Sequence, residues 1–306
     1  MLFPPDFLTR LEYLSMMSKR VFRGRLLAQR RSLQTGAGLE FSDHREYAPG
    51  EDLRYLDWNI YARHGQMLVK RFQEEQDLQV SILLDASRSM SFGSPSKFDR
   101  ARQLAAAFAW LALADLDRAG ISVFADGLVQ ELPGGRGRER ILGLMRFLES
   151  LSAAGQGTRF TRATQDFLQR APRPGLAIVL SDLLDPAGIS EGLDQLRYRR
   201  YDLHVVQLFA PQDAHPELLG DVELEDLETG EMRQVRVTER VAAEYRRAFL
   251  QHQHVVRSYC RRYGFRWTAA DSSVPYDQLM LQMMKVAGME SGGEPDSLGD
   301  LAERPR

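Results

Sequence analysis

The chain has 306 residues, enough for one large domain or two small ones. Its 40 Lys and Arg nearly balance 42 Asp and Glu, and the formal charge of −2 argues against a dedicated nucleic-acid-binding protein. The single cysteine, Cys260, excludes an intrachain disulfide and a Cys-x-x-Cys zinc or redox motif. The longest apolar run, 104–114, is shorter than the roughly 20 residues of a membrane-spanning helix, and the N-terminus lacks a secretory apolar stretch. We therefore expect a cytoplasmic protein without an integral membrane segment.

The first part of the chain is helical, then basic, then turn-rich. Residues 7–31 begin with apolar side chains at helical spacing and continue into an arginine-rich run. Such a run is typical of a solvated helix face, and the alternative is an anchor for an acidic partner or a phosphate. The polar stretch 40–63 follows, so we expect residues 1–77 to form an N-terminal arm distinct from the rest.

From residue 78 the sequence alternates apolar runs with longer amphipathic stretches, which predict strands and helices respectively. The expected strands are 78–84, 121–124, 129–132, 176–180, 203–209 and 265–269, and the expected helices are 101–116, 138–151, 161–170, 188–197, 241–259 and 276–286. This order predicts an α/β fold with a doubly wound, mostly parallel sheet and helices on both faces.

An insertion and a tail complete the predicted organisation. The runs 222–226 and 233–237 flank a Glu-Thr-Gly-Glu turn, which indicates an exposed β-hairpin inserted near 220–238. The α/β domain is expected to span 78–287. Residues 288–306 are rich in Gly, Pro and acidic residues and lack aromatics, a composition typical of a disordered tail.

An acid and two hydroxyls follow the first predicted strand of this domain, at Asp85, Ser87 and Ser89. Ligands of doubly wound sheets bind beyond the carboxyl ends of the strands. Oxygen donors at this spacing suit Mg²⁺ or Mn²⁺. Thr158 follows a glycine-bearing loop and Asp182 follows another predicted strand, so both are expected at the same edge.

The candidate metal ligands are therefore Asp85, Ser87, Ser89, Thr158 and Asp182. Structural alternatives exist for several of them. Ser87 and Ser89 could cap the next helix, and Asp182 could belong to an Asx-turn. Asp185 is a competing second carboxylate, and Asp182 is preferred because it lies closer to the end of its strand.

These five residues, with the strand–helix order around them, resemble the metal-ion-dependent adhesion site of von Willebrand factor A domains. The resemblance implies that Ser87, Ser89 and Thr158 touch the metal directly or nearly so, while Asp85 and Asp182 hold coordinated waters. One coordination position would stay open. Because neutral hydroxyls leave the ion electron-poor, that position favours a carboxylate from a partner protein.

A second resemblance lies in residues 38–63, which are similar to the signature of the bacterial domain of unknown function 58 family, R-x-Y-x-P-G-D/E-D-x-R-x-x-D-W followed by A-R. The matching residues are Arg45, Tyr47, Pro49, Gly50, Glu51, Asp52, Arg54, Asp57, Trp58, Ala62 and Arg63. Members resemble von Willebrand factor A domains and are linked with MoxR-type AAA+ ATPases in protein assembly or maturation. The resemblance therefore implies such an ATPase as a partner.

Arginines and acids interleave along this signature, a pattern typical of bidentate ion pairs. We expect an ion-paired clasp, with Trp58 as an apolar anchor, that fastens the N-terminal arm to the sheet domain. A docking face for the ATPase is a second, compatible interpretation.

Together these features predict a non-enzymatic, metal-dependent protein-interaction module that acts as an adaptor for the ATPase or binds a client protein. We expect no catalytic residues and no nucleotide site, because a Walker loop is absent and the histidines lack ligand-like spacing. Two alternatives stay open: a metal-dependent phosphoester hydrolase, and a scaffold with a non-functional metal site.

Overall fold

The protein is described here by a computed structural model that covers residues 2–16, 35–36, 40–73, 78–155, 157–171, 173–216 and 218–289. The chain divides into two compact units, one of residues 1–21 with 78–306 and the other of residues 22–77. The basic run within 7–31, from residue 17 on, and most of the expected tail, from residue 290 on, lie outside the described residues.

The N-terminal helix belongs to the α/β unit, whereas the sequence placed it with the rest of residues 1–77. The helical residues 7–16 bury Phe7, Leu11 and Leu14 almost completely. The ring of Phe7 lies 4.6 Å from that of Tyr276, centroid to centroid. The helix packs there because its apolar stripe needs a partner surface, and the α/β unit offers one.

The larger unit is built on a sheet with the strand order β11-β8-β7-β4-β5-β6. Its strands are β4 (Gln79–Asp85), β5 (Arg118–Phe124), β6 (Leu128–Gly135), β7 (Leu176–Ser181), β8 (Asp202–Phe209) and β11 (Arg266–Asp271). Neighbouring strands are parallel except β6, which pairs antiparallel with β5. The predicted doubly wound, mostly parallel sheet is confirmed.

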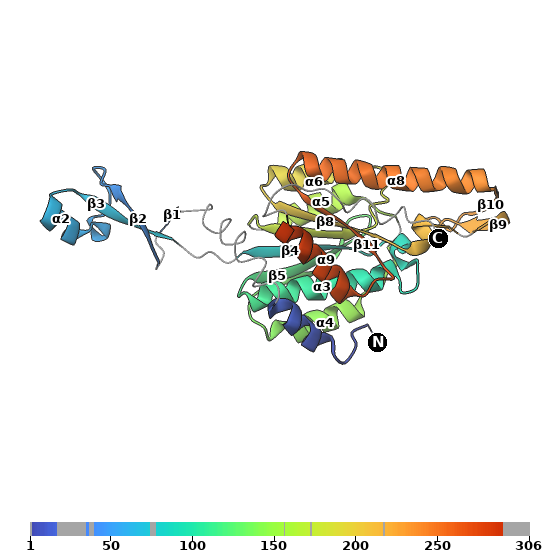
Figure 1. Ribbon diagram of the computed structural model, residues 1–306, viewed down its shortest axis with the longest axis horizontal. Helices are drawn as coiled ribbons and strands as arrows, with labels where there is room; N and C mark the ends of the chain where they lie inside the picture. Colours follow the sequence, from blue (N-terminus) through green and yellow to red (C-terminus); the bar gives the residue numbers. More distant parts are fainter. Residues whose placement is uncertain are drawn as a thin grey trace. The chain divides into compact units, whose positions relative to one another are not determined.

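Helices cover both faces of this sheet, with α3, α4 and α9 on one side and α5, α6 and α8 on the other (Figure 1). Their bounds are α3 (Lys97–Ala114), α4 (Arg140–Ser150), α5 (Phe160–Arg170), α6 (Ser190–Tyr198), α8 (Glu239–Arg262) and α9 (Tyr276–Met289). Two short elements, η2 (Arg88–Ser91) and α7 (Pro211–Ala214), were not predicted. The apolar strands are almost fully buried because each lies between two helical layers.

Strand order reverses between β4 and β7, which are neighbours in the sheet although far apart in sequence. After β4 the chain moves to β5 on one side, and after β7 it moves to β8 on the other. Such a switch point opens a crevice beyond the carboxyl ends of the two strands, where doubly wound proteins bind ligands. Asp85 ends β4 and Ser181 ends β7, so the polar residues that follow both strands meet there.

The predicted β-hairpin is present as β9 (Gly220–Glu225) and β10 (Met232–Val237). Among the described strands these two pair only with each other, and most of their residues are exposed. β10 leads into α8 and lies beside its first turns (Figure 1). The hairpin is therefore an appendage of the α/β unit, outside its sheet.

The smaller unit contains β2 (Glu40–Glu46) and β3 (Leu68–Gln73) in antiparallel pairing, with β1 (Thr35–Gly36) on the other side of β3. Between β2 and β3 lie η1 (Leu53–Tyr55) and α2 (Trp58–His64). The sequence predicted only a turn-rich stretch here because β2 is almost entirely polar and lacks apolar alternation. Across both units, no described helix is long and apolar enough to cross a bilayer.

Candidate functional site

Asp85, the last residue of β4, lies at the centre of the candidate site and is fully buried. Its Oδ1 accepts the Ser87 N–H at 2.9 Å, and its Oδ2 accepts the Ser181 hydroxyl at 2.6 Å. Burial raises the pKa of Asp85 and the nearby negative charge of Asp182 raises it further, while the hydrogen bonds from Ser181 and Ser87 lower it less. The carboxylate therefore lies where additional positive charge would be favourable.

Ser87 and Ser89 direct their hydroxyls at each other, with the two Oγ atoms 3.1 Å apart. Ser87 occupies the N-cap position of η2, but its side chain makes no capping hydrogen bond, so the alternative capping role is not seen for it. The oxygen separation is close to the about 3 Å between neighbouring ligands in an octahedral magnesium shell. The hydroxyl pair thus has a spacing that suits such an ion.

The loop that carries Thr158 lies directly against the Asp85 loop, as predicted. The Gly155 N–H donates to the Ala86 carbonyl at 3.1 Å, and the Arg88 N–H donates to the Gly155 carbonyl at 3.3 Å. A Cβ at Gly155 would collide with the Ala125 side chain, so glycine is required for this approach. Thr158, three residues after Gly155 in the sequence, is buried.

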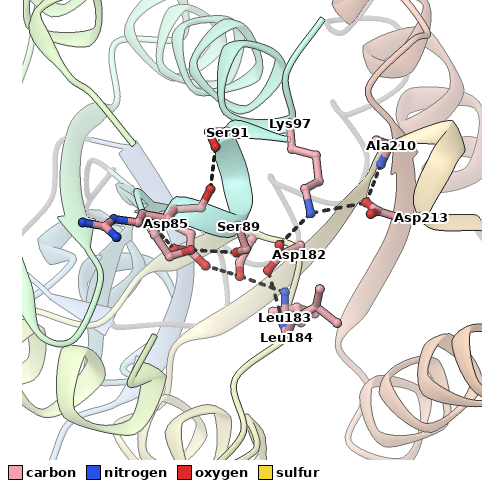
Figure 2. Close-up of polar contacts among 12 residues, drawn as sticks. Asp85, Ser89, Ser91, Lys97, Asp182, Leu183, Leu184, Ala210 and Asp213 are labelled. Carbon is pink, nitrogen blue, oxygen red and sulfur yellow. Dashed lines mark hydrogen bonds and ion pairs between the residues drawn. The ribbon is translucent and has the colours of Figure 1, made fainter. Parts of the chain in front are cut away.

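Asp182 reaches the site from the end of β7, but its carboxylate also has a buried cationic partner. Lys97 Nζ lies 2.8 Å from Asp182 Oδ2 and 3.3 Å from Asp213 Oδ2, and Lys97 is only 2% exposed (Figure 2). Burial alone would lower the pKa of Lys97, but the two carboxylates more than offset it and raise the pKa. Lys97 therefore stays charged and holds Asp182 beside the Asp85 loop.

The competing carboxylate, Asp185, has a different role. Its Oδ2 accepts the Phe160 N–H at the start of α5 at 2.7 Å, and its Oδ1 accepts the Ala187 N–H at 2.8 Å. Both oxygens are thus engaged in holding the first turn of α5 and the loop after β7. Asp182 is engaged in a similar way, since its Oδ1 accepts the Leu184 N–H at 3.3 Å, as in the Asx-turn alternative. The choice between the two carboxylates stays a prediction.

One carboxylate at the site was not foreseen from the sequence. Glu228, in the turn between β9 and β10, accepts the Ser89 N–H through Oε1 at 3.0 Å and the Gly157 N–H through Oε2 at 2.7 Å. The sequence indicated the hairpin turn but gave no sign of this contact, which joins residues 139 and 71 positions apart. Lys97, Ser181 and Asp213 were missed for the same reason.

The donor set fits a divalent cation by its charge and its oxygen chemistry. Asp85 lies near Asp182 and next to the hydroxyl pair of Ser87 and Ser89. Glu228 binds the backbone N–H groups of the two site loops, and Lys97 forms an ion pair with Asp182. No group of three or more His, Cys, Asp or Glu side chains in the described parts of the chain is arranged to hold a metal. A metal at this site would therefore depend on the hydroxyl oxygens, as Mg²⁺ and Mn²⁺ tolerate.

The signature segment forms a network inside the smaller unit. Arg45 pairs with Glu51, and Arg54 binds Asp52 with an NH2–Oδ2 distance of 2.6 Å. Because these pairs are exposed and local in sequence, they contribute little stability each. They connect parts of the same unit, whereas the predicted clasp would join the arm to the sheet domain.

Asp57 is the best-connected acid of this segment. It caps α2 by accepting the N–H groups of Asn59 and Ile60, and it also lies 3.1 Å from His44 Nε2 and 3.3 Å from Lys70 Nζ. Burial raises the pKa of Asp57, but these hydrogen bonds outweigh it and lower the pKa to about 2. Trp58 is 58% exposed, so it is not part of the core of this unit, and its role as an anchor for the sheet domain stays a prediction.

The family profile described as "Protein of unknown function DUF58" matches residues 43–255. An uncharacterized protein of Mycobacterium bovis is 27% identical over 253 residues, which cover 81% of this chain and 80% of that protein.

Solved structures are similar to this chain at lower sequence identity. The conserved hypothetical protein BatB from Bacteroides thetaiotaomicron is 20% identical and aligns with 70% of this chain and 100% of its own, with a TM-score of 0.43. Proximal thread matrix protein 1 from the mussel byssus, with a zinc-occupied MIDAS motif, is 10% identical and aligns with 69% of this chain and 47% of its own, with a TM-score of 0.41.

Substituting Gly155→Ala should destabilise the α/β unit by about 1–3 kcal/mol, because the new methyl group overpacks the contact between the two site loops. Chemical denaturation of the purified protein measures this change. Gly143→Ala is the matched control: Gly143 lies in α4 with open space around it, so alanine should stabilise by about 0.5–1 kcal/mol. Equal effects of the two variants would contradict the proposed loop packing.

Substituting Lys97→Met should lower the free energy of unfolding by about 3–5 kcal/mol, because it leaves Asp182 buried without its cation. Adding Asp182→Asn in the same chain should recover part of the loss, since the unpaired charge is then removed. Lys285→Met, at an exposed position of α9, should change stability by less than about 0.5 kcal/mol. The ion pair is unimportant if the Lys97 and Lys285 variants unfold alike.

Proposed function

Since the chain belongs to the DUF58 family, whose function is unknown, we propose from its own geometry that it is a non-enzymatic protein-interaction module whose candidate site holds Mg²⁺ or Mn²⁺ and captures a partner carboxylate. We further propose that it acts as an adaptor for a MoxR-type AAA+ ATPase, or for that ATPase's client, in the cytoplasm. The chain is an α/β protein of this family, and polar side chains gather at the switch point of its sheet.

The observation that carries the proposal is the convergence of polar groups at the switch point. The Asp85 loop follows strand β4, and Asp182 follows the adjacent strand β7. The loop that contains Gly155 is hydrogen-bonded to the Asp85 loop. If an ion binds, Ser87, Ser89 and Thr158 would hold it, with Asp85 and Asp182 supplying negative charge. The ion would supply a Lewis-acidic point for an incoming carboxylate.

The engaged state of the titratable groups favours binding over catalysis. Both oxygens of Asp85 accept hydrogen bonds from Ser87 and Ser181, which leaves its carboxylate poorly placed to activate a water. Lys97 is paired with two carboxylates. Cys260 lies on the buried face of α8, and burial raises the pKa of its thiol to about 12, so it is a packing residue.

The smaller unit offers a surface suited to a protein partner. Among the residues of this unit that the structure describes, the large apolar side chains exposed to solvent are Leu53, Tyr55, Trp58, Tyr61 and Met67. Trp58 and Tyr61 lie edge to face, with ring centroids 6.2 Å apart. Exposed tryptophan and tyrosine side chains are typical of the centres of protein interfaces. We propose that this surface docks the ATPase.

We expect Mg²⁺ or Mn²⁺ to bind the purified protein with a stoichiometry near one, and Asp85→Ala and Asp182→Ala to abolish binding because each removes half of the compensating carboxylate charge. Isothermal titration calorimetry measures the stoichiometry and the affinity of metal binding for each protein. Asp126→Ala is the matched control, because Asp126 is an exposed acid at the end of the neighbouring strand β5. Absence of binding to the unaltered protein, with partner binding intact, would favour a scaffold with a non-functional metal site.

The partner assignment is tested by capture of a purified MoxR-type ATPase. We expect Trp58→Ala to weaken binding by about 30-fold, as for an interface anchor, without loss of stability. Tyr198→Ala, on α6 and 87% exposed, should leave binding unchanged. Capture that is identical for the Trp58 and Tyr198 variants would show that this surface does not dock the ATPase.

The hydrolase alternative has its own measurement. Purified protein with Mg²⁺ is assayed on generic phosphatase and nuclease substrates, with Asp182→Ala in parallel. Robust turnover that the variant loses would overturn the interaction proposal. Absence of turnover in a preparation that binds the metal supports it.

A further inference from the structure

The hairpin between β8 and α8 touches the candidate site through one side chain. The two carboxylate oxygens of Glu228 accept separate backbone N–H groups, those of Ser89 and Gly157. These two residues lie in the loops that carry the hydroxyls of the proposed site. A carboxylate thus already lies where an incoming carboxylate is expected.

We propose that Glu228 is an internal ligand of this site, and that the β9–β10 hairpin is a displaceable cover that a partner's carboxylate must move aside. This inference rests on the proposed function and adds its regulation. It assigns to the Ser89 and Gly157 amides a binding position for a carboxylate. The external ligand is the side chain of a Glu or Asp on a partner protein, because it must replace Glu228 with the same chemistry.

The turn that carries Glu228 is organised to present it. Asp226 accepts the N–H groups of Glu228 and Thr229 through Oδ1, at 2.8 and 3.2 Å. Gly230 has a φ of +74°, and its N–H donates to the Asp226 carbonyl at 2.7 Å. Because the turn fixes its own backbone, the Cα–Cβ direction of Glu228 is set before its carboxylate meets the site.

The rest of the hairpin binds the α/β unit weakly. Most residues of β9 and β10 are exposed, whereas Leu227 and Glu228 at the turn are half-buried. Movement of the hairpin would therefore expose little apolar surface. The cover is held mainly by the two charge-assisted hydrogen bonds of Glu228, which an external carboxylate can replace one for one.

The contact between Glu228 and the two amides depends on the other charges at the site. Glu228 brings a further negative charge to a site that already holds Asp85 and Asp182, and Lys97 is engaged by Asp182 and Asp213. The repulsion favours release of the hairpin, and the two amides oppose it. Because only molecules with a released hairpin accept an external ligand, the apparent affinity equals the intrinsic affinity multiplied by the released fraction.

Backbone amide signals of the full-length protein, labelled with ¹⁵N and deuterated, report this position directly, with acetate as the carboxylate probe and EDTA present. In Glu228→Ala the Ser89 and Gly157 amide protons should move upfield, because they lose a charged acceptor. Acetate should restore both signals in this variant. The concentration needed should be at least about 10-fold lower than the concentration at which acetate shifts these signals in the unaltered protein.

Two further variants control the experiment. Glu225→Ala removes an exposed acid from β9 of the same hairpin and should behave as the unaltered protein. Glu228→Gln keeps the side-chain length and one acceptor oxygen, so it should lie between the unaltered protein and the alanine variant. Unmoved Ser89 and Gly157 signals in Glu228→Ala, or an equal response to acetate in all proteins, would overturn the inference.

Repeating the titration with Mg²⁺ in place of EDTA separates this inference from the proposed function. If the metal binds, Mg²⁺ and acetate should each strengthen the other's binding in Glu228→Ala, because binding effects are reciprocal. If calorimetry finds no metal binding, the metal-dependent function fails, yet the titration in EDTA still decides whether Glu228 occupies the two amides.

Discussion

The structure of the candidate site depends on a fully buried carboxylate at the switch point of the sheet. Asp85 is held by Ser87 and Ser181, but both donors are neutral and the nearby Asp182 carries the same charge. A buried charge without a full counter-charge is costly. Lys97 relieves part of this cost through Asp182. A divalent cation would relieve the rest, and the proposed metal binding rests on this charge imbalance.

The same charge imbalance bears on the proposed role of the β9–β10 hairpin. Without its turn, the β9–β10 hairpin would be a solvated appendage, since its strands pair with nothing else in the described parts of the chain. Through Glu228 it becomes a cover for the site. A binding surface that carries its own occupant has a lower apparent affinity but a sharper requirement for its ligand, because the ligand must compete with a tethered carboxylate.

Each of the two units has a separate part in the proposed function. The α/β unit carries the polar site, and the smaller unit carries exposed aromatic side chains on a short helix capped by Asp57. Asp57 connects α2 with His44 of β2 and Lys70 of β3, whereas the exposed ion pairs of the signature add little stability. Trp58 is then free to contact a partner protein.

The sequence alone determined the fold class, because apolar runs that alternate with amphipathic stretches allow few arrangements other than a covered parallel sheet. It also located Asp85, Ser87 and Ser89, whose spacing is local, and it placed Asp182 by its position at a strand end. The polar strand β2 escaped prediction because its pairing with β3 depends on hydrogen bonds between backbones.

Only the tertiary structure decided the electrostatics of the site. Lys97, Asp213 and Glu228 come from separate elements, and no local pattern marks any of them as part of one cluster. The packing of α3 on the sheet brings the lysine in, and the hairpin delivers the glutamate. Spacing along a chain predicts which groups share a loop or a face, whereas the meeting of charges across 85 or 139 residues depends on how the elements pack.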